Sequence, residues 1–294
     1  AGPAPAVRTF MATDLVQARS ARRVAELGIQ KHAPTAVVYC SMTAALLWPR
    51  PGAIWLDTIA AENRPGRHGL WQRPVERLRL AQAPLLLTMA PESLATHRGR
   101  SCAPSVVVPV PVSRTDDGGG LAARDIDVLA YTGDPVKRRL DVILAAWARA
   151  RRGDETLVVA GLERPAGVTP PAGATFAGRL APDAYRALVR RAKVFVAAPR
   201  REDFGIAQLE ALADGAMLVT TPAPGPYVAL PIARALDPRL VGDDLVSGLR
   251  AALDDPVEGY ALRAAELVAP FSPEAVTATL GEHVLPRLLP GWRA

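Results

Sequence analysis

The sequence of 294 residues has few of the residues that build disulfide frameworks or metal sites. Its two cysteines, Cys40 and Cys102, are too few for a disulfide framework, and its four histidines show no metal-ligand spacing. No apolar run reaches the roughly 18 residues that a membrane-spanning helix needs. These absences favour a cytoplasmic, metal-independent protein.

Lysine is also rare, and arginine supplies almost all of the formal net charge of +6. The excess of basic over acidic side chains falls within residues 1–120, which carry 14 basic and 8 acidic side chains. A basic surface there would favour an anionic acceptor or anionic lipid, whereas dispersed arginines are typical of a solvated face. We favour the solvated face, because the charges form no block.

No internal repeat of 20 to 50 residues occurs, which excludes a solenoid. Apolar strands instead alternate with amphipathic helices, as in parallel α/β units. Asp14 is expected to cap the first helix, and Gly28 to end it. In the first part, we expect helices at 14–27 and 75–81 and strands at 36–40, 53–56 and 85–89.

A polar, glycine-rich stretch at 113–120 predicts a flexible connection to a second domain. The same alternation continues beyond it. There we expect strands at 127–131, 156–160, 175–177, 194–198 and 218–221, and helices at 140–151, 184–191, 208–213, 244–253 and 273–285. The predicted fold class is α/β, with two doubly wound domains facing a cleft.

The stretch 197–215 reads AAPRREDFGIAQLEALADG and predicts an anion site flanked by two carboxylates. Glu202 lies in the loop, Gly205 at the helix start, and Glu210 inside the helix. Gly205 lets a ligand approach the backbone, where free amides and the helix dipole can hold a diphosphate. Acidic residues near helix starts are common, so the spacing alone leaves open that Glu202 and Asp203 merely complement the helix start and that Glu210 lies on the solvated face of the helix.

A second cluster, YTGDPVKRRLD at 131–141, places a turn and three consecutive cations after a strand. Carboxyl ends of strands are where open α/β sheets bind ligands. Lys137 and Arg138 could there neutralise phosphates and stabilise a departing nucleoside diphosphate. A solvated basic loop is the alternative.

These clusters, in this order on one domain, resemble the retaining glycosyltransferases of family 4, which have the two-domain GT-B fold. The resemblance covers residues 127–289. It rests on a phosphate loop at 133–137, VVAG at 158–161, FAGR at 176–179 and the E-x7-E motif of Glu202 and Glu210.

The resemblance implies transfer of a hexose-type sugar from a nucleoside-diphosphate donor with retention of configuration (EC 2.4). By this resemblance, Glu202 contacts the transferred sugar, Glu210 the ribose, and Lys137 or Arg138 the diphosphate. The implied donor-binding residues are Gly133, Phe204, Gly205, Ile206 and Glu210, and the catalytic residues are Glu202, Lys137 and Arg138. It implies no tightly bound metal and no cofactor beyond the nucleotide-sugar co-substrate.

The sequence departs from the family pattern in three places, one of which is that the usual Pro-Ser before the first motif glutamate is shifted to Ala198-Pro199. Asp134 follows Gly133 where the family often has arginine, so the choice between Lys137 and Arg138 stays open. Residues 14–90 resemble only the later part of the acceptor domain, so we expect an incomplete N-terminal domain. The expected organisation is an acceptor-side domain at 1–112, a linker at 113–124, a donor domain at 125–271 and a C-terminal helix at 272–294. By resemblance, this helix packs back on the first domain; an ordinary terminal helix is the alternative.

The loop after the second expected strand carries the acceptor-side candidates Asp57, Arg64 and His68. The expected partners are the nucleotide-sugar donor and an unidentified glycan, lipid or small-molecule acceptor. Peripheral contact with an anionic membrane, at its cytoplasmic face, is compatible with the basic first part. The alternatives are a nucleotide-sugar-binding protein without transferase activity and a basic module for anions or nucleic acid. We expect no nucleic-acid binding, because no aromatic residues interleave with the cations.

Overall fold

The computed structural model describes residues 10–97, 102–115 and 124–292. The chain divides into two compact units, Ala1–Pro109 with Thr277–Ala294 (unit 1) and Val110–Val276 (unit 2). Most of the expected linker, at 113–124, lies outside the described residues. The predicted domain boundaries stay a prediction, because compactness alone does not define a domain that folds by itself.

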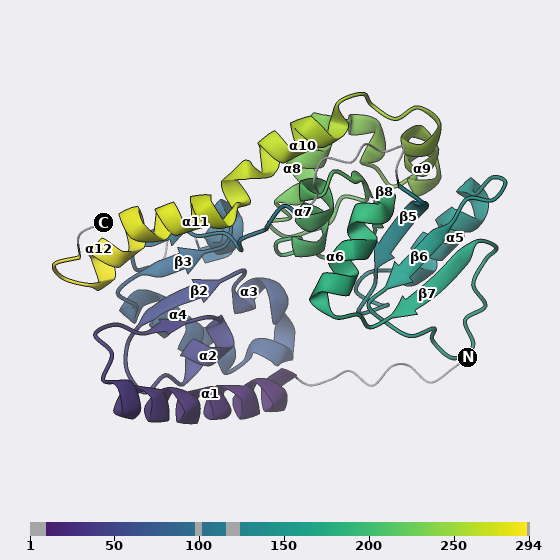
Figure 1. Ribbon diagram of the computed structural model, residues 1–294. Coiled ribbons are helices and arrows are strands. Elements are labelled where there is room, and N and C mark those ends of the chain that lie inside the picture. The colour runs from purple at the N-terminus through teal and green to yellow at the C-terminus, as the bar shows by residue number, and fades with distance from the viewer. Residues whose placement is uncertain (1–9, 98–101, 116–123, 293–294) are drawn as a thin grey trace. The chain divides into compact units, whose positions relative to one another are not determined.

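Unit 1 is built around a parallel sheet of four strands in the order β1-β2-β3-β4. The strands are β1 (Val38–Tyr39), β2 (Ala53–Leu56), β3 (Leu86–Thr88) and β4 (Ser105–Val107). The helices are α1 (Phe10–His32), α2 (Met42–Leu46), α3 (Ala60–Asn63) and α4 (Gln72–Gln82), and 3-10 helices span Gly66–Gly69 and Pro91–His97. α1 packs against α2, which contacts β2, and both lie on one side of the sheet (Figure 1). The central strands β2 and β3 are almost wholly buried, as short apolar runs in parallel sheets usually are.

The first helix corrects two expectations. α1 extends from Phe10 to His32, so Gly28 lies inside it, and it ends where Ala33 adopts a φ of +42°. Asp14 does not cap the helix, because it lies inside it and is buried at 3% exposure. Its carboxylate accepts hydrogen bonds from Arg64 and Gln72 instead, which are contacts that a local pattern cannot show.

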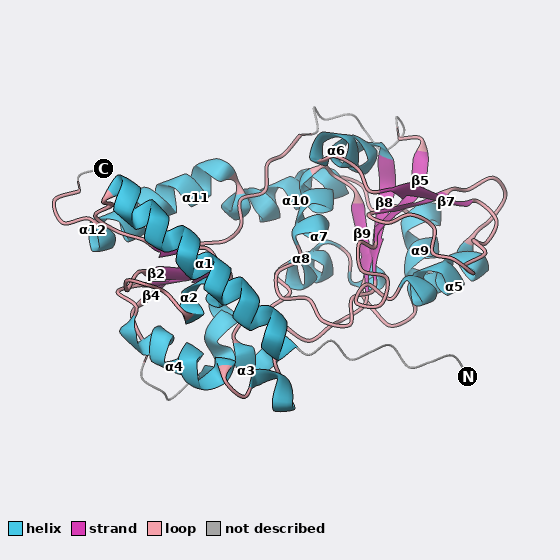
Figure 2. Cartoon of the chain, turned by 90° about the horizontal axis from the view of Figure 1, so that it is seen from below, coloured by secondary structure: helices cyan, strands magenta, loops and turns pink. Residues whose placement is uncertain are grey.

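Unit 2 contains a parallel sheet of five strands in the order β7-β6-β5-β8-β9. The strands are β5 (Ile126–Tyr131), β6 (Leu157–Ala160), β7 (Ala174–Gly178), β8 (Ala192–Ala197) and β9 (Met217–Thr220). The helices are α5 (Leu140–Ala150), α6 (Pro182–Arg191), α7 (Ile206–Ala213), α8 (Ala229–Leu236), α9 (Leu245–Asp254), α10 (Tyr260–Val268) and α11 (Pro273–Thr279). Figure 2 shows α5 and α9 on one face of this sheet and α6 on the other, which is the doubly wound arrangement.

The predicted fold class is confirmed, because both units are α/β with parallel sheets. Every expected strand is present within two residues of its predicted ends. The sequence analysis missed β4, α2, α3, α8 and α10. The expected helix at 273–285 is divided into α11, a π-helical turn at Leu280–Val284 and α12 (Leu285–Leu288). In the part of the chain that the structure describes, no helix has the length and apolar character needed to cross a membrane.

Candidate functional site

The strand order of unit 2 places both sequence clusters at one crevice. β5 pairs with β6 on one side and with β8 on the other, so the chain reverses its direction of winding between β5 and β8. The loop after β5 carries residues 132–139, and the loop after β8 carries residues 198–205. Parallel α/β sheets bind ligands at such a switch point, beyond the carboxyl ends of the strands.

Gly205 is the residue that opens α7 at this crevice. Its φ of +97° lies in the left-handed region, which a residue with a side chain adopts only under strain. It caps α7 without a side-chain hydrogen bond, so no side chain of the cap covers the first-turn amides. These amides and the positive end of the helix dipole form a site suited to an anion.

Glu202 is held at the same crevice by residues from both clusters. It is 6% exposed, and its Oε2 accepts hydrogen bonds from Arg138 of the β5 loop and from Gln208 Nε2 of α7, the latter at 2.9 Å. Its backbone is fixed too, because its amide donates to Pro224 O at 3.0 Å and its carbonyl accepts from the Tyr227 amide at 3.2 Å. Arg138 and Glu202 are 64 positions apart in the sequence, so only the fold brings them together.

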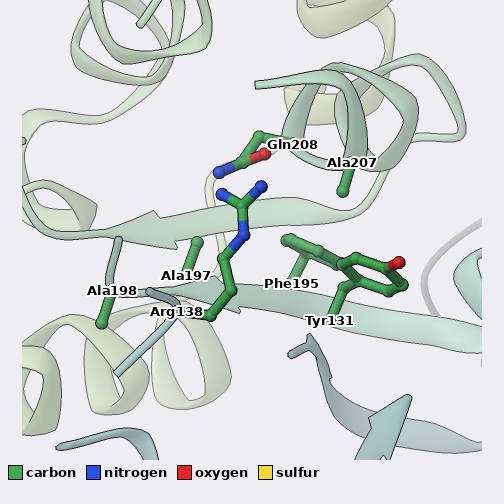
Figure 3. Close-up of a pocket in the computed structure, with 7 residues that line it drawn as sticks. All are labelled: Tyr131, Arg138, Phe195, Ala197, Ala198, Ala207 and Gln208. Atoms are coloured by element: carbon green, nitrogen blue, oxygen red, sulfur yellow. The ribbon is translucent and has the colours of Figure 1, made fainter. Parts of the chain in front are cut away.

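Figure 3 shows the Arg138 guanidinium and the Gln208 carboxamide directed toward each other. They border a small pocket of about 10 Å³, which offers room for about one water. The other lining residues are Tyr131, Phe195, Ala197, Ala198 and Ala207. Gln208 was not singled out from the sequence, because a glutamine inside a helix carries no signal of its own.

The two predicted phosphate-binding cations have different surroundings. Arg138 borders the pocket and pairs with Glu202, whereas Lys137 is exposed. The Lys137 backbone is fixed, because its amide donates to Asp134 Oδ1 at 3.0 Å and its carbonyl accepts from the Arg200 amide at 2.9 Å. Arg138 is therefore the cation that the fold directs into the crevice.

Glu210 lies on α7, two residues beyond Gln208, and faces an arginine of α6. Arg186 contacts Glu210 Oε1 at 3.4 Å and the fully buried Asp214 at 2.7 Å. Burial raises the pKa of Glu210, and the Arg186 charge opposes that increase. The sequence analysis missed Arg186, because this contact between helices depends on how α6 and α7 pack.

The remaining donor-side residues surround the same loops. A side chain at Gly133 would place its Cβ 2.9 Å from the Tyr131 hydroxyl, and one at Gly161 would place it 2.8 Å from the Gly133 amide. The loops after β5 and β6 therefore pack backbone against backbone. Phe204 is buried against Phe271, with ring centroids 6.0 Å apart, and Ile206 is 45% exposed at the first position of α7.

The acceptor-side candidates lie in unit 1. Asp57 and Arg64 line a cavity of about 230 Å³ beyond β2, which His68 does not line. His68 lies in the neighbouring 3-10 helix, Gly66–Gly69. Among the described residues, no group of three or more His, Cys, Asp or Glu side chains could hold a metal ion.

Comparison with known proteins gives the crevice a family context. The model of the family described as "Glycosyl transferases group 1" matches residues 127–258. No curated protein matches the sequence. A sucrose-phosphate synthase from Thermosynechococcus elongatus is 16% identical with a TM-score of 0.69, and the match covers 96% of this chain and 80% of that one.

Two further solved structures have the same fold. WaaG, a glycosyltransferase involved in lipopolysaccharide biosynthesis, is 17% identical with a TM-score of 0.65, over 87% of this chain and 80% of that one. A trehalose-6-phosphate structure from E. coli, bound with UDP-2-fluoro glucose, is 11% identical with a TM-score of 0.65, over 89% of this chain and 76% of that one. The chain therefore has the GT-B fold, and its residues 127–258 match the family of glycosyl transferases group 1.

Proposed function

We propose that this protein is a group 1 glycosyltransferase that moves a hexose-type sugar from a nucleoside diphosphate to an acceptor, with retention of anomeric configuration. The observation that carries the proposal is the pairing of Arg138 with Glu202 beside the open start of α7, at the switch point of the sheet. A cation, free helix amides and a carboxylate are thus gathered where a diphosphate and its sugar can be bound together.

The donor would be bound by groups that the fold gathers at this crevice. The diphosphate oxygens would accept hydrogen bonds from the α7 amides and from Arg138, while Glu210 would accept hydrogen bonds from the ribose hydroxyls. When Arg138 turns to the diphosphate, Glu202 loses its cation and becomes available to the sugar hydroxyls. Gln208 would keep Glu202 oriented during this exchange, because its carboxamide donates to the same oxygen.

No carboxylate of this site is assigned as a nucleophile. The acceptor hydroxyl would attack on the face from which the diphosphate leaves, and its proton would pass to the leaving phosphate oxygen. Arg138 and the α7 amides would stabilise the charge that develops on that phosphate, a role whose loss typically lowers the rate by about 10²- to 10³-fold.

The location and partners of the protein remain part of this proposal. A cytoplasmic location is supported by Cys40 and Cys102, which are both free thiols at the surface.

The proposal is tested by calorimetric titration of the chain with UDP, GDP and other nucleoside diphosphates, without added metal. We expect at least one diphosphate to bind, and Glu210→Ala to weaken it by at least about tenfold. Glu258→Ala removes an exposed glutamate near the start of α10 and is the matched control, which should bind as the wild type does. Equal affinity in Glu210→Ala would contradict the ribose assignment.

The same titration separates the two cations. Arg138→Ala should weaken diphosphate binding by about tenfold or more, whereas Lys137→Ala should change it by less than about threefold. A chain that is folded but binds no diphosphate would reject the donor site. A chain that binds the diphosphate, yet transfers no sugar from the matching donor to any acceptor, would be a binding protein.

A further inference from the structure

Unit 1 contains a polar cavity at the carboxyl ends of two adjacent strands. Ser41 lies just after β1 and Asp57 just after β2, and both line this cavity of about 230 Å³. Its remaining walls come from α1, α2, α3 and α4. The cavity is far larger than a single water requires, and it lies where parallel sheets place their ligands.

Three carboxylates line this cavity, against one guanidinium. The acids are Asp14, Asp57 and Glu76, and the cation is Arg64. Arg64 is already paired with Asp14, at 2.8 Å and 3.2 Å. Glu76 is 3% exposed, and both of its oxygens accept from the Ala60 amide, at 2.9 Å and 2.8 Å. The lining therefore offers many acceptors and an excess of negative charge.

Gln72 adds an acceptor that the described part of the protein leaves unused. It is 1% exposed and lines the cavity, and its Nε2 donates to Asp14 at 3.1 Å. This bond directs the carboxamide so that Oε1 is left buried, with no hydrogen-bond partner in the part of the chain that the structure describes. Buried acceptors are nearly always satisfied, so this oxygen indicates a place for a donor that a ligand or a water supplies.

We propose that this cavity binds a neutral, hydroxyl-rich ring, namely a sugar or cyclitol that bears no phosphate or carboxylate on the part that enters. Hydroxyls suit the lining, because each can donate to Gln72 Oε1 or to a carboxylate and can accept from Arg64. An anionic group would be repelled by Asp57 and, at a pH where its buried carboxyl is ionised, by Glu76 as well. Taken together with the proposed function, on which this identification rests, the ring is part of the acceptor.

The basic character of residues 1–120 does not extend into the cavity. The sequence permitted an anionic acceptor on the grounds of total charge, but the lining is acidic. Total charge acts over the solvated surface, whereas selection of a ligand depends on the groups within hydrogen-bond distance. The proposed selectivity for a neutral ring therefore applies to the part of the acceptor that the cavity encloses.

The test is a set of NMR titrations of the ¹⁵N-labelled full chain, followed through the carboxamide signals of Gln72 and Asn63, which both line the cavity. The probes are neutral methyl hexopyranosides and myo-inositol, compared at equal ionic strength with glucose-6-phosphate, glucuronate and glucosamine. We expect at least one neutral probe to shift both signals, and to bind at least about tenfold more tightly than either anionic probe.

Variants assign any binding to the cavity. Gln72→Met keeps the length of the side chain and removes both polar atoms, so it should weaken binding of the neutral probe by about tenfold. Gln82→Met, an exposed change at the end of the same helix, is the matched control and should leave binding unchanged. If Gln72→Met does not fold, Asp57→Asn serves instead and should narrow the preference for neutral over anionic probes.

Three results would overturn the inference: no neutral probe shifts the two signals, an anionic probe binds as well as the neutral ones, or glucosamine binds more than tenfold better than all of them. A diphosphate titration of the same sample tests the donor site separately. Diphosphate binding without sugar binding would reject this inference alone. Sugar binding without diphosphate binding would reject the donor site and, with it, the ring's identification as acceptor.

Discussion

At the scale of single residues, the buried carboxyl of Glu76 in unit 1 makes the free energy of unfolding depend on pH. Burial raises its pKa from 4.5 to about 7, against the opposing effects of the Ala60 amide, Arg64 and Arg77. The folded state thus binds the Glu76 proton more tightly than the unfolded state does. The resulting stabilisation is fully present below about pH 4.5 and is lost as the pH rises toward 7, because the buried carboxyl must then ionise.

Glu76→Gln should remove this dependence, since glutamine keeps an acceptor for the Ala60 amide and cannot ionise. Relative to the variant, the wild type should lose roughly 3 kcal/mol of unfolding free energy between pH 4 and pH 8. Urea denaturation of both proteins across this range measures the difference. Glu92→Gln changes an exposed carboxyl of the same unit and should show no such trend. Parallel curves for the wild type and Glu76→Gln would show that Glu76 is ionised throughout.

At the scale of elements, α7 depends on a left-handed residue at its start. Gly205→Ala would place a Cβ 3.3 Å from the Tyr227 ring at a φ of +97°, so it should lower stability by about 1–3 kcal/mol. It should also weaken diphosphate binding by at least about tenfold, because the first-turn amides must move. Denaturation and calorimetric titration measure the two effects.

Gly259 supplies the matched control for that helix start. It caps α10 with a φ of +67°, and a Cβ there would meet no atom within 4 Å. Gly259→Ala should therefore lower stability through its left-handed φ, without any change in diphosphate binding. If both variants bound diphosphate as the wild type does, the amides of α7 would not form the phosphate site.

At the scale of the whole molecule, the chain consists of two compact units, each with its own sheet and core. The proposed diphosphate site uses residues of unit 2 only. In scanning calorimetry, the ligand should therefore raise the midpoint temperature of one of two unfolding transitions. At about 100 times its Kd, the diphosphate should contribute about 2.7 kcal/mol, or roughly 5–10 °C for a unit of this size. The midpoint temperature of the other transition should not change. A single transition that moves as a whole would show instead that the units unfold together.

The sequence alone determined the alternation of strands and helices, because the apolar runs and the helical periods that produce it are local. Ala53–Leu56 shows this most clearly, since the expected strand and the observed β2 have the same bounds. The sequence also placed the two clusters at 131–141 and 197–215 on one α/β domain. The roles of their residues remain predictions until a donor is bound.

Only the tertiary structure decided which side chains meet. Arg138 meets Glu202, Arg186 meets Glu210, and Gln72 meets Asp14, in each case across two different elements of the fold. Strand order brings the first pair to one crevice, and helix packing makes the other two. Composition pointed to a basic first part, while the cavity within that part is acidic. The physical reason is common to all these cases: hydrogen bonds and charge pairs act over a few ångströms in space, whatever the separation along the chain.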